Sequence, residues 1–282
     1  MKKLFLLFVI INNIIFPNIS DSLYNFIQYD KNIISNSVYL NSIFEKYTKN
    51  KKIRILHIGD SFLVSGYFGK SFIENIRNDF NIKNASLIGF DTNKKKYKKR
   101  YIKRNIIINK TLIENSDTIG VEYLIFASSG KTYEYFYRNT QLSNIINEYH
   151  PDLIIISLGI NDAMNMYLYE EFYKIVEAFY KKYENSEIKF LLTTPIDFIT
   201  KKRKNNITLI NSVIKDFSNS KSIAYYDFYE ISGGKGARVQ WYKVGLSNKD
   251  MIHLKQEGYN LQGKLFAEAF LRAYNEYRKN YN

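Results

Sequence analysis

Apolar runs and amphipathic stretches alternate along most of the chain. Runs without a helical period predict buried strands at 53–58, 85–90, 106–113, 121–127, 153–158, 187–193 and 222–226. Apolar residues at helical spacing predict helices at 66–80, 140–149, 168–184, 203–217 and 256–279. A glycine-rich loop is predicted at 231–239. Strands that alternate with helices in this way are typical of β-α-β units, so we predict a mostly parallel sheet covered by helices on both faces.

Small polar clusters follow three of the predicted strands. They are Gly59-Asp60-Ser61, Ser128-Ser129-Gly130 and Gly159-Ile160-Asn161-Asp162. A fourth cluster, Asp250-Met251-Ile252-His253, precedes the last predicted helix. In parallel α/β sheets the binding crevice lies beyond the carboxyl ends of the strands. We therefore expect the four clusters to meet in one site.

The residue types in these clusters match what acyl transfer requires. The reaction needs a hydroxyl nucleophile, an imidazole that takes its proton and a carboxylate that orients the imidazole. Ser61 is expected on a sharp strand-to-helix turn that exposes its Oγ. Asp250 precedes His253 by three residues, close enough for a local hydrogen bond. We predict a catalytic triad of Ser61, Asp250 and His253.

Donors for the developing oxyanion are also available at the strand ends. The backbone N–H of Ser61 is expected to lie free near a helix N-terminus, where negative charge is stabilised. The N–H of Gly130 and the side-chain amide of Asn161 complete a predicted oxyanion hole. Asp60 and Asp162 are interpreted mainly as structural, holding turns through hydrogen bonds from backbone N–H groups.

The chain has three histidines, so the candidate base can be sought by elimination. His57 lies within the first predicted strand and is interpreted as a buried packing residue. His150 ends a predicted helix directly before Pro151, where an imidazole commonly caps carbonyl groups. His253 lies in a polar loop behind an acidic residue, which leaves it as the candidate base.

Trp241 and Tyr242 stand just ahead of the candidate catalytic segment. The lone Trp suits either stacking on a sugar ring or packing in a core or lid. Both residues are candidates for substrate binding.

The order of the four motifs resembles that of the SGNH/GDSL hydrolase family over residues 53–275. The family's signature residues fall on Ser61, Gly130, Asn161 and His253, with Asp250 as the third member of the triad. Phe62 stands where Leu or His is more usual in the family. The stretches HIGDS, GVEYLIFASSG, PDLIIISLGINDA and GLSNKDMIH look like the bacterial cell-envelope branch, which includes peptidoglycan O-acetylesterases.

The resemblance implies a flavodoxin-like three-layer α/β/α fold and a serine esterase that needs no cofactor and no metal. It implies that the substrate is an acylated carbohydrate, with an O-acetyl group on an envelope polysaccharide such as peptidoglycan expected. Two alternatives stay open: an O-acetyltransferase acting on the same glycans, and a non-catalytic glycan-binding or assembly protein on this scaffold.

The amino-acid composition excludes several classes of protein and of functional site. The 282 residues are 45% hydrophobic and 24% charged, which is typical of a globular protein. The absence of cysteine excludes disulfide scaffolds, cysteine-ligated zinc, thiol nucleophiles and a lipoprotein anchor. The net charge of +14 favours polyanionic surroundings, or simply reflects solvated lysines. The basic block 94–104 suits either reading, and no nucleic-acid-reading element accompanies it.

The N-terminus has the pattern of an export signal. Lys2 and Lys3 precede an apolar run that Asn12 and Asn13 interrupt, which is too short for a membrane span. We expect a signal peptide at 1–20, a lead-in helix and loop at 21–50, and one catalytic domain at 51–282. The mature protein is expected to be periplasmic or secreted, without a stable membrane span.

Overall fold

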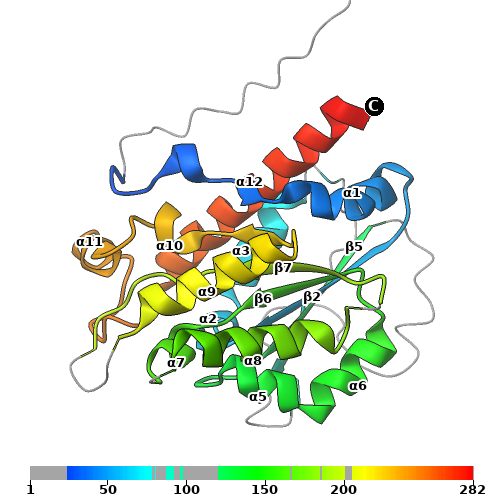
Figure 1. Ribbon diagram of the computed structural model, residues 1–282. Coiled ribbons are helices and arrows are strands. Elements are labelled where there is room, and N and C mark those ends of the chain that lie inside the picture. Colours follow the sequence, from blue (N-terminus) through cyan, green and yellow to red (C-terminus); the bar gives the residue numbers. More distant parts are fainter. Residues whose placement is uncertain are drawn as a thin grey trace, which may run out of the picture.

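One eight-stranded sheet forms the centre of the protein (Figure 1). The computed structural model describes residues 24–77, 80, 87–91, 96–97, 120–165, 167–184, 186–200 and 205–281. The strand order is β1-β8-β7-β6-β2-β5-β3-β4. The strands are β1 (Ile34–Ser35), β2 (Ile53–Gly59), β3 (Leu87–Asp91), β4 (Lys96–Tyr97), β5 (Val121–Ala127), β6 (Leu153–Ser157), β7 (Lys189–Thr193) and β8 (Ala224–Tyr226).

The six central strands are parallel, and the two edge strands β1 and β4 are antiparallel to their neighbours. In this register Gly59 at the end of β2 lies beside Ala127 of β5 and Ser157 of β6. The carboxyl ends of the three strands are therefore level, and the segments that follow them start from one edge of the sheet. The predicted mostly parallel sheet is confirmed.

Helices cover both faces of the sheet (Figure 1). The longer ones are α1 (Asn41–Thr48), α3 (Tyr67–Ile76), α5 (Tyr133–Arg138), α6 (Thr140–Tyr149), α8 (Tyr169–Lys181), α9 (Ile207–Ser220), α11 (Ala237–Lys243) and α12 (Gln256–Tyr281). Single turns form α2 (Ser61–Val64), α7 (Ile160–Ala163) and α10 (Phe228–Ile231), and two 3-10 turns lie at Tyr29–Lys31 and Ser37–Leu40. This arrangement is the predicted three-layer α/β/α fold.

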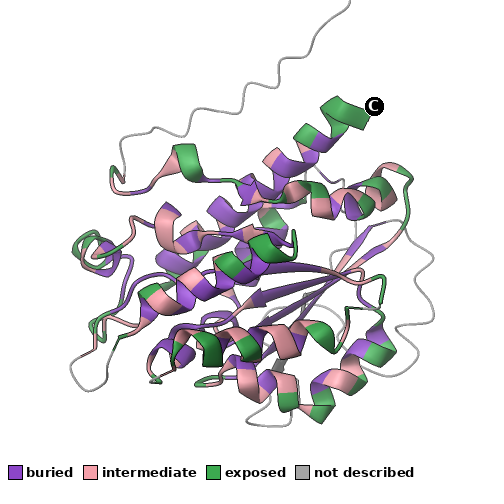
Figure 2. Ribbon diagram, viewed as in Figure 1, coloured by how far each residue is buried: buried purple, intermediate pink, exposed green. Residues whose placement is uncertain are grey.

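The helices pack closely on a sheet that is buried from both sides (Figure 2). Leu153, Ile154, Ile155 and Ile156 of β6 are all buried, which explains why this strand is a continuous apolar run rather than an alternating one. On one face α12 approaches α3 so closely that a Cβ on Gly263 would lie 2.5 Å from the carbonyl oxygen of Phe68. Only glycine allows the two helices to pack this closely.

The region between β8 and α12 differs from the predicted loop. Residues 231–239 were expected to be a glycine-rich loop, but α11 begins at Ala237 within them. Gly236 caps this helix in the left-handed region at φ +86°, a conformation that glycine adopts without steric cost. The turn that the glycines form is therefore short, and the following residues continue as a helix.

Several expectations concern residues that the structure describes in part. The predicted signal peptide at 1–20 and the predicted strand at 106–113 lie outside the described residues. Of the basic block 94–104, only Lys96–Tyr97 is described, as strand β4. In the predicted lead-in, β1 extends the sheet and Phe44 of α1 packs against Phe270 of α12.

Candidate active site

Ser61 is held at the junction of β2 and α2. Asp60 caps α2, accepting a hydrogen bond of 3.0 Å from the backbone N–H of Phe62. A Cβ on Gly59 would lie 2.5 Å from Leu63 Cδ1 and 3.0 Å from the carbonyl oxygen of Ser157. Glycine at this position therefore lets the helix turn start tightly against the sheet. The turn leaves Ser61 half-buried, as its first helical residue.

Ser61, His253 and Asp250 form a continuous chain of hydrogen bonds. The Ser61 Oγ lies 3.0 Å from His253 Nε2, and His253 Nδ1 lies 2.6 Å from Asp250 Oδ2. A carboxylate accepts hydrogen bonds, so the Nδ1–H donates to Asp250 and Nε2 is left to accept from the serine hydroxyl. This arrangement allows the imidazole to remove the proton from Ser61.

The Asp250 carboxylate is held in its ionised form. Its Oδ1 accepts hydrogen bonds of 2.9 Å from the backbone N–H groups of Ile252 and His253. Partial burial raises the pKa of Asp250, but the hydrogen bonds from the His253 side chain and from the two N–H groups outweigh it and keep the pKa below its ordinary value. The charge that orients His253 is therefore present at neutral pH.

A buried arginine supports the segment that carries His253. The carbonyl oxygen of His253 accepts hydrogen bonds from the Ser247 hydroxyl at 3.2 Å and from the Asn248 N–H at 2.9 Å. Arg238 Nη1 donates to Ser247 Oγ at 3.3 Å, and Arg238 Nε donates to the carbonyl oxygen of Asp197 at 3.0 Å. Arg238 is fully buried, and among the described residues its Nη2 has no hydrogen-bond partner. Sequence reasoning missed this residue because it lies in the segment expected to be a loop.

The Phe62 ring of α2 packs against the imidazole of His253. The Phe62 ring lies 6.2 Å from the His253 ring and 5.4 Å from the Tyr259 ring, measured between centroids. The Arg238 guanidinium lies over the Phe62 ring, with Cζ 5.9 Å from the ring centroid. Phe62, the residue after Ser61, thus packs against His253, Tyr259 and Arg238.

Asn161 lies beside the nucleophile turn. Its Nδ2 donates to Asp60 Oδ2 and to the carbonyl oxygen of Lys131, both at 3.1 Å. Gly130, directly before Lys131, is exposed and has φ +75°. The structure therefore brings Asn161 together with Asp60 and with the 130–131 turn, and both amide hydrogens of Asn161 have acceptors.

The two aspartates interpreted as structural do hold turns. Asp60 caps α2 as described above, and both oxygens of Asp162 accept from the N–H of Tyr133, at 3.1 and 3.3 Å. Burial raises the pKa of Asp60 to about 6, against the hydrogen bonds that lower it. Burial raises the pKa of Asp162 further, to about 8, and the nearby Asp60 adds to the effect.

A second histidine–serine contact lies inside the core. His57 Nε2 lies 2.7 Å from Ser157 Oγ, and His57 Nδ1 contacts the Tyr123 hydroxyl. His57 is fully buried, and burial lowers its pKa to about 3. Hydroxyl groups rather than a carboxylate satisfy both ring nitrogens, which confirms the interpretation of His57 as a packing residue.

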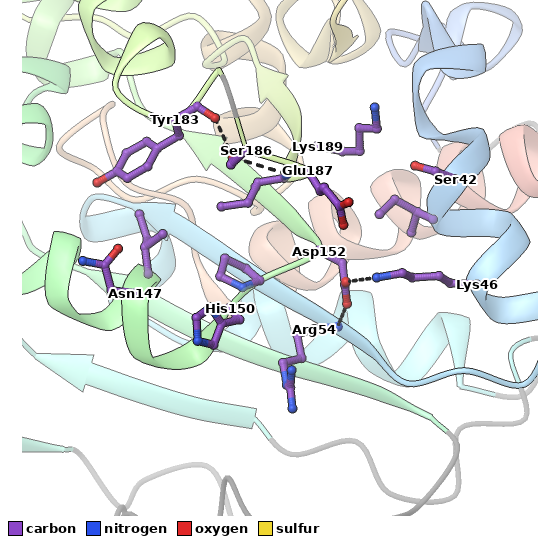
Figure 3. Close-up of a pocket in the computed structure, with 14 residues that line it drawn as sticks. Ser42, Lys46, Arg54, Asn147, His150, Asp152, Tyr183, Ser186, Glu187 and Lys189 are labelled. Carbon is purple, nitrogen blue, oxygen red and sulfur yellow. Dashed lines mark hydrogen bonds and ion pairs between the residues drawn. The ribbon is translucent and has the colours of Figure 1, made fainter.

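His150 lies at the other end of the strands. It ends α6 in the left-handed region at φ 48° and lines a cavity of about 850 Å³ (Figure 3). In the same cavity Lys46 forms an ion pair of 2.5 Å with Asp152, which precedes β6. The cavity therefore opens at the amino ends of the strands, away from Ser61.

Trp241 and Tyr242 differ in their surroundings. Trp241 is fully buried, donates from Nε1 to the carbonyl oxygen of Ser232 at 3.0 Å and packs against Phe26 and Phe228. Its ring has no free face for a sugar, so the expectation of sugar stacking is wrong for Trp241 and the packing alternative holds. Tyr242 is 41% exposed and lines a cavity that Asp250 also lines.

The described residues contain neither a cluster of metal-ligating side chains nor a membrane-spanning helix. No group of three or more His, Cys, Asp or Glu side chains among them is placed to hold a metal ion. None of the helices in that part of the chain is long and apolar enough to cross a membrane.

The chain is similar to known proteins in sequence pattern and in fold. A family model described as GDSL-like lipase/acylhydrolase matches residues 55–266. A search of curated protein sequences found no match.

Among solved structures, a peptidoglycan O-acetylesterase superposes with a TM-score of 0.67 at 11% identity, covering 86% of this chain and 98% of its own. A two-domain esterase active on acetylated mannans gives 0.55 at 12% identity, covering 88% of this chain and 57% of its own. An acetylxylan esterase from Geobacillus stearothermophilus gives 0.52 at 14% identity, covering 79% and 94%. These likenesses show the shared fold. The family model covers most of the chain, and the chain therefore belongs to the GDSL-like lipase/acylhydrolase family of carboxylic ester hydrolases.

Proposed function

We propose that this enzyme removes O-acetyl groups from envelope polysaccharide, with peptidoglycan as its substrate and Ser61 as its nucleophile. The observation that carries the proposal is the hydrogen-bonded chain from Ser61 through His253 to Asp250. It lies at the carboxyl edge of the parallel sheet, where α/β proteins bind their substrates.

The proposed reaction proceeds through an acyl-enzyme. Ser61 Oγ attacks the ester carbonyl carbon while His253 Nε2 takes the hydroxyl proton, and Asp250 stabilises the imidazolium that forms. The tetrahedral intermediate collapses, the C–O bond to the sugar breaks, and His253 returns the proton to the leaving sugar oxygen. Water then attacks the acetyl-serine with His253 as base, which releases acetate and restores Ser61.

The proposed oxyanion hole consists of the N–H groups of Ser61 and Gly130 and the amide of Asn161. In the structure both hydrogens of Asn161 have acceptors, Asp60 and the Lys131 carbonyl. We infer that substrate binding moves the turn at 130–132, so that the Lys131 carbonyl releases one of these hydrogens to the oxyanion. The exposed Gly130, with open space around its Cα, suits such a movement.

The substrate assignment rests on similarity and on location. Structures with this fold include a peptidoglycan O-acetylesterase and esterases that act on acetylated mannans and xylans. The expected signal peptide at 1–20 would deliver the enzyme to the periplasm or the outside of the cell, where such glycans lie. The exposed Tyr242 beside Asp250 offers a ring on which a sugar can stack.

The direct test is acetate release from O-acetylated peptidoglycan. Purified parent enzyme and Ser61→Ala are incubated with the polymer, and free acetate is measured, together with acetyl transfer to added chitooligosaccharides. We expect acetate from the parent alone, with little acetylated oligosaccharide. Equal release by Ser61→Ala would contradict the proposed nucleophile, and sugar acetylation that outpaces hydrolysis would identify a transferase.

A further inference from the structure

A cavity of about 720 Å³ opens directly beside the catalytic carboxylate. It is lined by Tyr242, Lys243, Asn248, Lys249, Asp250 and Lys255. These residues come from the end of α11, the loop that carries Asp250 and His253, and the residue before α12. Asp250 connects this cavity to the chain of hydrogen bonds that leads through His253 to Ser61.

The cavity is positively charged. Lys243, Lys249 and Lys255 are all exposed, and within the described ranges none of their ammonium groups has a carboxylate within 4.0 Å. Lys46 and Lys215, by contrast, form ion pairs with Asp152 and Asp227.

Asp250 is the one acidic residue in the lining of the cavity, and its oxygens already accept from His253 and from backbone N–H groups. It is therefore a poor ion-pair partner for the lysines. The three ammonium groups are left to interact with solvent or with a bound anion.

We propose that this cavity is a subsite for a carboxylate carried by the acetylated glycan, bound by Lys243, Lys249 and Lys255. The inference rests on the proposed glycan esterase function and narrows it to anionic glycans. Lysine ammonium groups on flexible stems can follow a carboxylate whose position varies, as it does on a polymer. The ring of Tyr242 supplies an apolar face for the sugar between the charges.

The strength of the effect follows from exposed charge pairs. Each such contact changes affinity about 1.5- to 5-fold, and salt weakens it. Three lysines together therefore raise the affinity for an anionic substrate on the order of tenfold at low ionic strength. We expect the effect in KM rather than in kcat, because the lysines contact the glycan and not the atoms that react.

The experiment uses two matched substrates. Soluble O-acetylated peptidoglycan fragments are used intact, and after conversion of their carboxylates to methylamides. The readout is the ratio of kcat/KM for acetate release from intact over amidated fragments, at low and at high salt. Acetylated glucuronoxylan fragments, treated in the same way, tell a carboxylate on the sugar from one on an attached peptide.

The variant replaces all three residues, Lys243→Gln, Lys249→Gln and Lys255→Gln. The matched control makes the same change in net charge at exposed lysines elsewhere, Lys174→Gln, Lys221→Gln and Lys279→Gln. The parent and the control are expected to prefer intact fragments on the order of tenfold at low salt. The triple variant at the cavity is expected to bring this ratio close to one, mainly through KM.

The outcomes separate the two proposals. A parent that cleaves both fragments equally well, or a preference that survives in the cavity variant, overturns the subsite and leaves the esterase function intact. Equal loss in the control variant also overturns it, since the effect would then be one of net charge. A parent that hydrolyses 4-nitrophenyl acetate but neither fragment overturns the glycan function and the subsite together.

Discussion

The Ser61 hydroxyl lies 3.0 Å from Nε2 of His253, although 192 residues separate the two in the chain. Ser61 follows the central strand β2, and His253 precedes α12, which packs against α3 on one face of the sheet. Ser61 and His253 meet because the carboxyl end of β2 and the start of α12 lie at the same edge of the sheet. The sheet register and the packing of α12 thus set the distance over which a proton would move.

The members of the proposed triad are expected to act as one unit. Ser61→Ala and His253→Ala should each lower kcat for 4-nitrophenyl acetate by several decades, because each removes a partner in the same proton transfer. The double variant should fall little further. Steady-state kinetics of the three variants checks this, and near-parental activity in either single variant would rule out the assignment.

Asn161 is predicted to act in the transition state. Asn161→Ala should lower kcat by about 10²–10³ with little change in KM, because an oxyanion donor contacts only the developing charge. Circular dichroism controls for folding, since the same change removes hydrogen bonds to Asp60 and Lys131. A change in KM alone would instead make Asn161 a substrate-binding residue.

Arg238 is predicted to position the segment that carries His253. Arg238→Met removes the donor to Ser247, so kcat should fall about ten- to a hundredfold as His253 loses its fixed placement. Thermal stability should change little, because the buried cation with an unpartnered Nη2 is costly to desolvate. Lys235→Met, at an exposed position in the same segment, is the matched control. Parental kcat in Arg238→Met would refute the positioning role.

Asp162 is predicted to make stability depend on pH. Its pKa of about 8 lies above the ordinary value, so its contribution to stability is complete below about pH 4 and is lost as the pH rises through 8. In Asp162→Asn the side-chain amide does not ionise, so this contribution to stability does not fall as the pH rises. The Tm of the variant minus that of the parent should therefore increase between pH 4 and pH 8. Asp216→Asn, at an exposed carboxylate on α9, controls for the change in charge. A constant difference would contradict the burial argument.

Most of the strands and helices could be predicted from the sequence. The bounds of β5 and α6 coincide with the predicted 121–127 and 140–149. The first is an apolar run that Ser128 follows, and the second has apolar residues at helical spacing and is followed by His150 and Pro151. The strand β1 was not predicted, since two residues are too few to show a period in the sequence. α11 was missed because its start lies among glycines.

The candidate active site could be predicted only in part from the sequence. Residue type and motif order pointed to Ser61, Asp250 and His253, but spacing along the chain gives no distance between segments so far apart. The roles of Trp241 and Arg238 depend on burial: one is packed between aromatic rings and the other beneath the His253 loop. In the sequence, neither the single Trp nor an arginine that follows several glycines indicates that its side chain is buried.

The central claim, that Ser61 is the activated nucleophile, is tested most directly by covalent labelling with a fluorophosphonate followed by peptide mass mapping. The structure contains a rival hydroxyl–imidazole pair, Ser157 and His57, so the position of the label decides between them. We predict one label per chain on Ser61, none in Ser61→Ala and much slower labelling in His253→Ala. Labelling at Ser157, or an unlabelled parent protein, would contradict the account.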